Sequence, residues 1–316
     1  MKAIRIHQRG GADDLVYEDA PRPQVPPGYA LVRVFATGIT PTELTWGETY
    51  ENCEGTPRLP SIPGHEVAGV VEEINGQDSG IKVGDSVYGL TEFCRDGSAA
   101  EYVAVRAADL APKPRTLDYA EAAAVPLSAL TAWQALVVHG GLSKGQRVLI
   151  HGAAGGVGTY AVQLAQLYGA HVIATASLRN APFLHDLGAD EVVDYASNRF
   201  EDKIKDVDVV LDAVGGDTLE RSWGVLKRGG VLVTLIANVP PEKPAQYGVR
   251  GIFFIVTPSR EQLTKIGVLI DSGSLKVIIQ KILSLDRARE AFLQALSGHN
   301  RGKIVLRVRE EEAQAA

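Results

Sequence analysis

The chain has 316 residues, of which 45% are hydrophobic and 22% are charged, and its formal net charge is −6 at pH 7. A chain of this size and apolar content can form two domains with ordinary cores. The net negative charge argues against a nucleic acid or an anionic membrane surface as the partner.

The N-terminal segment and the cysteines bear on where the protein works. Residues 1–6 alternate like a strand and lack the apolar core of a signal peptide. No stretch approaches the roughly 18 consecutive apolar residues that are needed to cross a membrane. The two cysteines, Cys53 and Cys94, are too few for a disulfide framework or a four-thiol zinc lobe. We interpret them as small apolar or loop residues, and we expect a protein of the reducing cytoplasm.

The first 120 residues are predicted to be rich in β-strands, because short alternating runs are separated by clusters of proline and glycine. These runs lie at residues 30–35, 66–74, 86–90 and 100–105. From Tyr119 helical periodicity appears, and strands then alternate with helices through residue 235. This alternation is typical of a doubly wound parallel sheet.

The C-terminal part is predicted to return to the β-rich domain. Two helical patterns follow Pro258, and a last strand is expected at residues 303–308. We therefore predict an α/β protein with a first catalytic segment at 1–120, a nucleotide-binding domain at 121–259 and a returning segment at 260–316.

The stretch at residues 146–177 predicts one β-α-β unit around a glycine-rich turn. An apolar run at 148–150 precedes the turn at 152–158, and a helical pattern and a second strand follow it. Gly155 and Gly156 would let backbone amides approach a diphosphate at the positive end of the helix. Ala153 takes the place of the first glycine in the simple pattern G-x-G-x-x-G. The strand before the turn and the helix after it are both present, so the context predicts a dinucleotide site.

The second strand of this unit indicates which dinucleotide is bound. Domains that prefer NAD usually carry an acid near its end, whereas residues 171–180 contain none. Ser177 and Asn180 can donate hydrogen bonds, and Arg179 can pair with a phosphate dianion. We predict a pocket for the 2′-phosphate, and therefore NADPH. The alternative is that Arg179 is a solvated charge at the start of the next helix.

Motifs in order along nearly the whole chain resemble those of a known family. They are Pro-Gly-His-Glu at 63–66, Val-Gly-Asp at 83–85, Ala-Glu-Tyr-Val at 100–103, Val-Pro at 125–126, the glycine turn, Leu-Gly-Ala at 187–189, Asp-Ala-Val-Gly at 212–215 and Arg-Gly-Lys at 301–303. Together they resemble the medium-chain dehydrogenase/reductase superfamily, specifically its zinc-free quinone oxidoreductase branch, which includes the zeta-crystallins. The resemblance implies a GroES-like catalytic domain formed from both chain ends and a Rossmann nucleotide-binding domain between them, with the active site in the cleft between the two domains. It also implies a homodimer formed by edge pairing of the strand at 251–256.

The resemblance also implies roles for individual positions. The cofactor contacts would be Thr131, Ala154, Gly155, Gly156, Val157, Ser177, Arg179, Asn180, Tyr195, Val214, Gly215 and Phe254. The catalytic candidates are Thr40, Tyr50 and Thr131. Three of these have simpler alternatives, since Thr131 can be an ordinary helix residue, Tyr195 an edge aromatic and Tyr50 a packing residue, with water as the proton source.

The metal ligands of the zinc-dependent relatives are largely missing here. Their positions resemble Thr40, the pair His65-Glu66 and the segment at 125–127, so only an imidazole and a carboxylate remain. A catalytic zinc site normally has three protein ligands and water, and we therefore expect no metal and a structural role for His65.

A reaction without metal favours an acceptor that delocalises charge. Hydride added to an enone or a quinone leaves the charge on oxygen, where hydrogen-bond donors and water suffice. Trp46 and Tyr50 lie in the loop expected to cover the nicotinamide, and aromatic walls suit a flat substrate. We predict an NADPH-dependent reductase of quinones or α,β-unsaturated carbonyls that transfers hydride directly. The alternatives are an enoyl-type reductase dedicated to one metabolite and a nucleotide-binding protein with little turnover.

Overall fold

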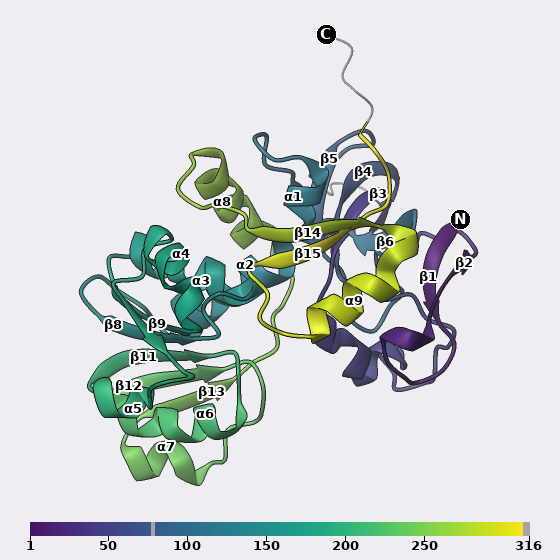
Figure 1. Ribbon diagram of the computed structural model, residues 1–316. Coiled ribbons are helices and arrows are strands. Elements are labelled where there is room, and N and C mark those ends of the chain that lie inside the picture. Colours follow the sequence, from purple (N-terminus) through teal and green to yellow (C-terminus); the bar gives the residue numbers. More distant parts are fainter. Residues whose placement is uncertain (77–79, 312–316) are drawn as a thin grey trace. The chain divides into compact units, whose positions relative to one another are not determined.

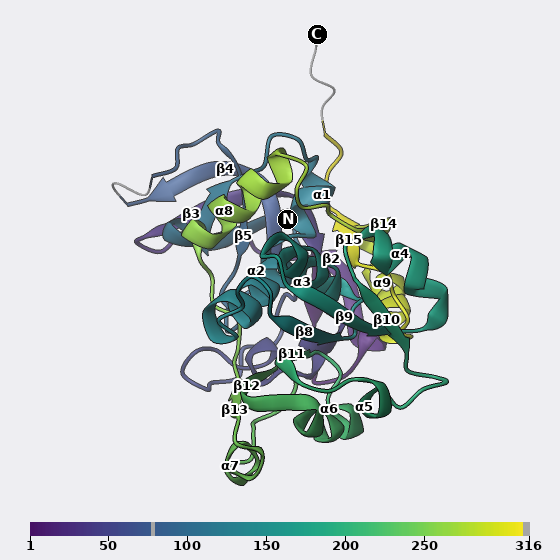
Figure 2. The ribbon, with the colours of Figure 1, turned by 90° about the vertical axis from the view of Figure 1, so that its left-hand side faces the viewer.

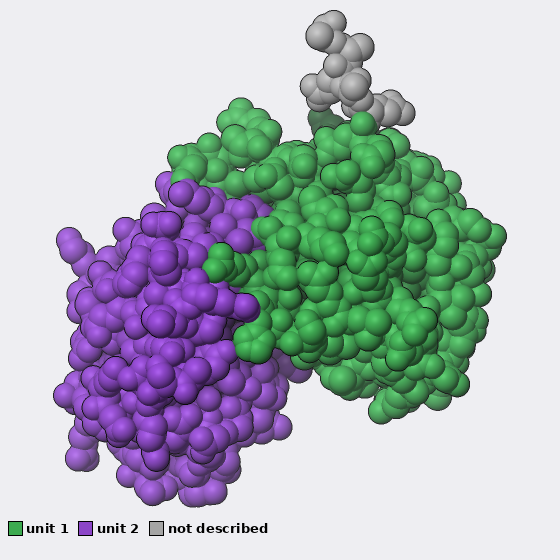
Figure 3. All heavy atoms as spheres, viewed as in Figure 1, with its two compact units in different colours: residues 1–127, 257–273, 279–316 green, residues 128–256, 274–278 purple. Residues whose placement is uncertain are grey.

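The computed structural model describes residues 1–76 and 80–311, and the chain forms two compact units (Figure 3). Unit 1 comprises Met1–Leu127, Thr257–Gly273 and Ile279–Ala316, and unit 2 comprises Ser128–Val256 and Ser274–Ile278. Unit 1 therefore draws on both ends of the chain. Within the described residues, no helix is long and apolar enough to cross a membrane.

Unit 1 is built on a seven-stranded sheet in the order β14-β15-β3-β4-β5-β7, with β6 paired to β3, and on a two-stranded sheet of β1 and β2 (Figure 1). The strands are β1 (Lys2–Ile6), β2 (Leu15–Asp19), β3 (Tyr29–Gly38), β4 (Glu66–Asn75), β5 (Ser86–Leu90), β6 (Tyr102–Arg106), β7 (Leu110–Pro112), β14 (Ile279–Ser284) and β15 (Lys303–Arg307). The helices are α1 (Tyr119–Ala123), α8 (Arg260–Asp271) and α9 (Ala288–Leu296). Apart from β14 with β15, all pairs in these two sheets are antiparallel.

The sequence pattern of unit 1 explains its cores. Alternate residues Ala30, Val32 and Val34 of β3 are buried together with Val67 and Val71 of β4. Helix α9 buries one face through positions spaced by three and four residues, namely Ala288, Ala291, Phe292 and Ala295. That face packs in a second core with residues from β1 and β15.

Unit 2 is a six-stranded parallel sheet in the order β10-β9-β8-β11-β12-β13. The strands are β8 (Arg147–His151), β9 (His171–Ala176), β10 (Glu191–Asp194), β11 (Val207–Asp212), β12 (Leu226–Thr234) and β13 (Arg250–Phe253). The helices are α2 (Pro126–Trp133), which begins at the junction, α3 (Gly156–Leu167), α4 (Ala181–Asp186), α5 (Phe200–Lys203), α6 (Gly216–Ser222) and α7 (Glu242–Tyr247).

The parallel sheet is covered on both faces. The consecutive residues 148–150 of β8 are all fully buried, although alternate side chains of a strand point to opposite faces. Helix α3 packs against β8 and β9, and α6 packs against β11 and β12 (Figures 1 and 2). The strand order reverses between β8 and β11, so the carboxyl ends of these two strands form the switch point at which such sheets bind ligands.

The predicted fold class is confirmed. Unit 2 has the doubly wound parallel sheet, and unit 1 has the β-rich architecture assembled from both chain ends.

The cysteines require a correction. Cys53 and Cys94 both lie in loops, as expected, but they form a disulfide with a Cα–Cα distance of 5.0 Å. They are 41 residues apart in sequence, so the pair depends on how two distant loops meet. The number of cysteines in the sequence could not show that these two loops lie next to each other.

Replacing Gly158 with Ala is expected to destabilise unit 2. A Cβ at this position of α3 would collide with the carbonyl oxygen of Gly152 and would lie 2.6 Å from the Cα of Ala153. Overpacking against backbone costs about 1–3 kcal/mol of unfolding free energy. Thermal or urea unfolding measures this loss.

The matched control is Gly224→Ala, because a Cβ at Gly224 would meet no atom within 4 Å. We expect this variant to stay within about 0.5 kcal/mol of the parent protein. Equal stability of the two variants would contradict the tight packing at Gly158.

Candidate functional site

The glycine turn between β8 and α3 presents backbone donors at the switch point. Gly155 caps α3 without a side-chain hydrogen bond, and the first turn of the helix carries no acidic residue. The first amides of a helix lack intrahelical acceptors, and the helix dipole makes this end positive. The predicted residues Ala154, Gly155, Gly156 and Val157 thus form a place where a diphosphate can be bound.

The turn after β11 lies beside the glycine turn. The carboxylate of Asp212, fully buried, accepts hydrogen bonds from the amides of Val214 and Gly215 at 3.1 and 2.9 Å. Gly215 has a φ of +78°, a conformation that favours glycine. A Cβ at Gly152 would lie 3.4 Å from the side chain of Val214, so the two turns are neighbours. The structure therefore brings together two of the predicted cofactor segments.

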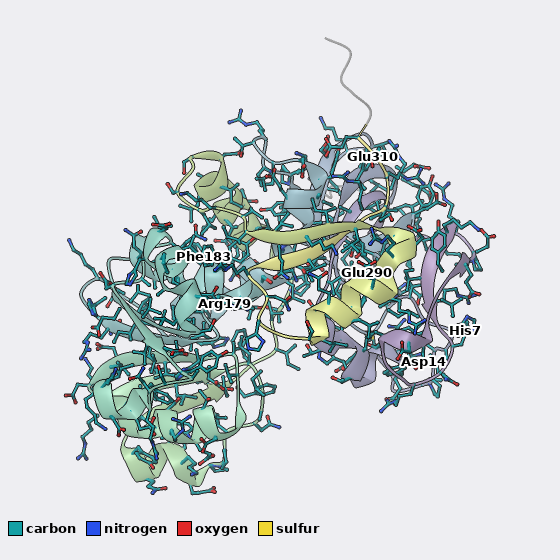
Figure 4. All side chains as sticks on the ribbon, viewed as in Figure 1. His7, Asp14, Arg179, Phe183, Glu290 and Glu310 are labelled. Atoms are coloured by element: carbon teal, nitrogen blue, oxygen red, sulfur yellow. A yellow bond between two sulfur atoms is a disulfide. The ribbon has the colours of Figure 1, made fainter. Side chains whose placement is uncertain are left out.

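The end of β9 adds a third segment. The amide of Ala153 donates to the carbonyl of Thr175 at 3.3 Å, which attaches the glycine turn to this strand. Ser177 precedes a short 3-10 helix, and the side-chain amide of Asn180 donates to its hydroxyl oxygen at 3.2 Å. Arg179 is exposed and lies in this 3-10 helix, just before α4. Figure 4 labels Arg179 and also Phe183, which belongs to α4.

The end of the neighbouring strand β10 carries an acid that the sequence analysis missed, and Tyr195 follows directly after it. The amide of Tyr195 donates to the carbonyl of Ala176 at 3.3 Å, and its side chain is 52% exposed. Asp194 pairs with Ala176 in the parallel register. The hydroxyl of Ser197 and nearby backbone amides, including that of Leu178, hold the pKa of the Asp194 carboxyl below its usual range.

Residues 171–180 contain no acid, so the second strand alone gives no reason to expect a carboxylate beside Ala176. The relevant signal was the strand ending Val-Val-Asp at 192–194, whose register with β9 becomes visible only in the folded sheet.

A buried histidine lies directly before the glycine turn. The hydroxyl of Ser222 donates to the carbonyl of Thr218 at 2.6 Å, so its oxygen accepts from Nε2–H of His151, 3.0 Å away. Nδ1 of His151 then accepts from the hydroxyl of Thr175 at 2.9 Å. Burial lowers the pKa of His151 to about 4, and the neutral ring links β8, β9 and α6 beneath the predicted cofactor segments.

Two other predicted cofactor contacts of unit 2, Thr131 and Phe254, lie on α2 and after β13. Thr131 is buried within α2. Phe254 follows the edge strand β13, and its ring centroid lies 4.5 Å from that of His139.

In unit 1, Tyr50 is a core residue. Its side chain is 3% exposed, and its hydroxyl lies 2.5 Å from the carbonyl oxygen of Leu44, to which it donates. This hydrogen bond has to break before the hydroxyl could give a proton to a substrate. Thr40 is half-buried and precedes a short 3-10 helix (Pro41–Thr45).

An aromatic cluster covers His65. The Trp46 ring stacks on the imidazole at 5.9 Å between centroids, and the Phe93 ring meets both rings edge-on, at 5.2 Å from Trp46 and 4.9 Å from His65. His65 is buried, whereas Trp46 and Phe93 are half-buried. Nδ1 of His65 lies 3.1 Å from the hydroxyl oxygen of Thr91.

Glu43 is a second acid that the sequence analysis missed, and unlike Asp194 it is fully buried. One carboxyl oxygen accepts from the amide of Gly64 at 2.9 Å and lies 3.5 Å from Nε2 of His65. Burial raises the pKa of Glu43 to about 8, and burial lowers the pKa of His65 to about 3. At neutral pH the pair is therefore largely uncharged, with a proton on the carboxyl group. No motif pointed to Glu43, because a single Glu outside any recognisable sequence pattern gives no hint of burial.

Comparison with known proteins places this geometry in a family. Residues 26–115 match the family described as alcohol dehydrogenase GroES-like domain, and residues 187–306 match the one described as zinc-binding dehydrogenase. The chain is 36% identical over 317 residues to a 2-methylene-furan-3-one reductase of Solanum lycopersicum, covering 97% of this chain and 79% of the relative. It is 34% identical over 317 residues to an NADPH-dependent alkenal/one oxidoreductase of Arabidopsis thaliana, with the same two coverages.

A solved structure agrees with these relatives. The quinone oxidoreductase from Coxiella burnetii has a TM-score of 0.91 at 33% identity, covering 98% of this chain and 99% of that one. The chain belongs to the medium-chain dehydrogenase/reductase superfamily. It groups there with quinone oxidoreductases and enone reductases, and its unit 1 contains the GroES-like domain that the sequence predicted.

The residues of this medium-chain reductase do not fit a catalytic zinc ion. Among residues 1–76 and 80–311, no group of three or more His, Cys, Asp or Glu side chains is arranged to hold a metal. Glu66 pairs with the ammonium of Lys303 and accepts from the amide of Leu127 at 3.0 Å, so its carboxylate is already engaged. The ring of His65 lies under Trp46 and Phe93. This donor set supplies no third ligand, although one matching family is described as zinc-binding.

Replacing Glu43 with Gln is expected to flatten the pH dependence of stability of this reductase between about pH 7.5 and 8.5. The pKa of Glu43 is raised from 4.5 to about 8 in the folded protein, so unfolding releases a proton in this range and stability falls as pH rises. The lowered pKa values of His65 and His151 have the opposite effect, with stability lost as pH falls below 6.5. The unfolded chain's histidines still bind protons up to about one pH unit above 6.5, so only the range from about pH 7.5 upward isolates Glu43.

Urea midpoints across this window provide the measurement. Gln keeps the oxygen that accepts from Gly64 but cannot titrate. The control is Glu73→Gln, an exposed position on β4 of the same unit, which should retain the parent profile. A Glu43→Gln profile as steep as that of the parent would contradict a protonated buried carboxyl.

Proposed function

We propose that the protein is an NADPH-dependent reductase of quinones or of the activated C=C bond of α,β-unsaturated carbonyls, which transfers hydride directly without a metal. The observation that carries this proposal is the grouping of the glycine turn with the ends of β9 and β11 at the switch point. Relatives named as a 2-methylene-furan-3-one reductase and an NADPH-dependent alkenal/one oxidoreductase support it.

Unit 2 would hold the cofactor through the segments described above. The amides at 154–157 bind the diphosphate, and Ser177, Arg179 and Asn180 bind the 2′-phosphate, with Tyr195 against the ribose. Val214 and Gly215 would border the cofactor at the carboxyl end of β11. Thr131 and Phe254 are proposed to lie near the nicotinamide end, on the strength of the family resemblance.

NADPH, when bound, supplies a hydride from nicotinamide C4. The chain's own contribution is to orient the acceptor and to stabilise the charge that develops on its oxygen, which hydrogen-bond donors accomplish without a Lewis acid. Thr40 is proposed as one such donor. Tyr50 is proposed as the proton source only if its bond to Leu44 opens, and water is the alternative.

One experiment distinguishes the proposed reductase from the two alternative functions, a dedicated enoyl-type reductase and a nucleotide-binding protein. NADPH absorbance is followed against a panel of quinones, enones and aldehydes, and the purified protein is analysed for metal. We expect quinone or enone turnover with less than stoichiometric zinc. Turnover of one enoyl-type metabolite alone would favour a dedicated reductase, and NADPH binding without turnover would favour a nucleotide-binding protein. Stoichiometric zinc would contradict the absence of a metal.

Replacing Arg179 with Ala is expected to weaken NADPH binding far more than NADH binding. Loss of a charge-assisted hydrogen bond to phosphate lowers affinity by about tenfold to a hundredfold. NADH lacks that phosphate, so its affinity should change little. Equilibrium titration of cofactor fluorescence measures both dissociation constants.

The control for this variant is Arg228→Ala, an exposed arginine near the opposite, amino-terminal end of β12. It should leave both affinities unchanged. Equal losses for NADPH and NADH in Arg179→Ala would contradict the 2′-phosphate assignment.

We also propose that the protein is a homodimer joined along β13. This strand is an edge of the six-stranded sheet, and Ile255 just after it is 60% exposed. An apolar edge strand is prone to pairing, and pairing with its own copy gives a closed two-fold dimer.

Ile255→Lys is expected to shift the protein toward monomer, as measured by light scattering after size exclusion. Val268→Lys, a substitution at a 64% exposed position on α8, is the control and should remain dimeric. A monomeric parent protein or a dimeric Ile255→Lys variant would contradict this interface.

We also propose that the protein is located in the cytoplasm, which cell fractionation tests.

A further inference from the structure

Two loops of unit 1 meet at three points. We call residues 46–58 the first loop and residues 91–98 the second loop. The Cys53–Cys94 disulfide joins them covalently. The guanidinium of Arg58 donates to the carboxylate of Asp96 at 2.8 Å, and the ring of Phe93 meets that of Trp46.

The first loop is closed by its own hydrogen bonds. The side-chain oxygen of Asn52 accepts from the amides of Glu54 and Thr56 at 3.0 and 2.8 Å. The amide of Arg58 donates to the carbonyl of Tyr50 at 3.0 Å. Cys53 therefore projects from a turn with a defined backbone, and it provides a fixed point for whatever is attached to it.

The second loop is anchored at its two ends. The amide of Thr91 donates to the carbonyl of His65 at 2.8 Å, and the amide of Gly97 donates to the carbonyl of Ile62 at 2.8 Å. The middle of the loop contains Phe93 and Cys94, and the disulfide attaches this part to the first loop. Because Phe93 is the chain neighbour of Cys94, the disulfide restricts the position of its ring.

We propose that the Cys53–Cys94 disulfide is a reversible positioning element for the acceptor. In the oxidised form it would hold Phe93 edge-on to Trp46 and His65, so that Trp46 and Phe93 form an aromatic wall for a flat conjugated acceptor. In the reduced form the middle of the second loop is released and the wall loses its fixed shape. The acceptor part of this inference rests on the proposed function.

The disulfide is open to reduction. Cys53 is exposed and Cys94 is half-buried, so a dithiol can attack from solvent. Thiol–disulfide exchange breaks the S–S bond, transfers two electrons and two protons to Cys53 and Cys94, and leaves the dithiol as a disulfide. In a reducing compartment disulfides are usually transient, which matches a reversible role better than a permanent one.

The first test counts thiols. Protein purified under air and denatured without reductant should show no free thiol, and the same protein treated with dithiothreitol should show two. Two free thiols before reduction would overturn the proposal.

The second test compares the kinetics of the oxidised and dithiothreitol-reduced forms with a quinone or enone. Loss of order in one aromatic side chain should raise the KM for the acceptor by about threefold to tenfold. The KM for NADPH should stay within about twofold, because unit 2 carries the proposed cofactor contacts. Equal increases in both values, or a fall in kcat alone together with lower thermal stability, would indicate a merely structural bond and would overturn the proposal.

Two variants make this comparison specific. Cys53→Ser/Cys94→Ser should match the reduced form and should not respond to dithiothreitol. Phe93→Leu should raise the KM for the acceptor in the oxidised form and should abolish the further effect of reduction. A reductant response that persists in the double serine variant would overturn the proposal.

A third readout separates this inference from the proposed function. Iodide quenching of Trp46, taken as the difference between the parent protein and Trp46→Phe, should increase on reduction. If neither form turns over any quinone or enone, the proposed function fails, and the quenching still decides the role of the disulfide. Unchanged quenching would overturn the role of the disulfide in positioning Trp46 and Phe93.

Discussion

Unit 2 depends on the contact between the start of α3 and the turn after β8. The backbone at Gly158 comes so close to Gly152 and Ala153 that a side chain has no room. This closeness directs the first amides of the helix to the switch point of the sheet. The hydrogen bonds of the buried His151 connect the end of β8, just before this turn, to β9 and α6, so one buried network joins the elements that carry the predicted cofactor segments.

Much of this arrangement could be predicted from local patterns. Glycine-rich turns, continuous apolar strands and helical periodicity each depend on neighbours in sequence, and they correctly gave the parallel sheet and the position of the glycine turn. The return of the last strand to unit 1 also followed from the order of elements.

The remaining features depend on contacts between distant segments. The burial that raises the pKa of Glu43, the register that brings Asp194 beside Ala176, and the pairing of Cys53 with Cys94 are all set by how strands and loops meet. Tyr50 illustrates the same limit, because a loop tyrosine in the sequence becomes a core residue once its hydroxyl finds the carbonyl of Leu44. Residue type alone did not distinguish these outcomes.

The buried pair of Glu66 and Lys303 has a consequence for biosynthesis. The carboxylate on β4 is fully buried, and its partner ammonium comes from β15, near the end of the chain. A buried charge without its partner is strongly destabilising. During synthesis, all strands of the parallel sheet of unit 2 leave the ribosome before Lys303 does. The sheet of unit 2 can therefore form while Glu66 of β4 still lacks its partner.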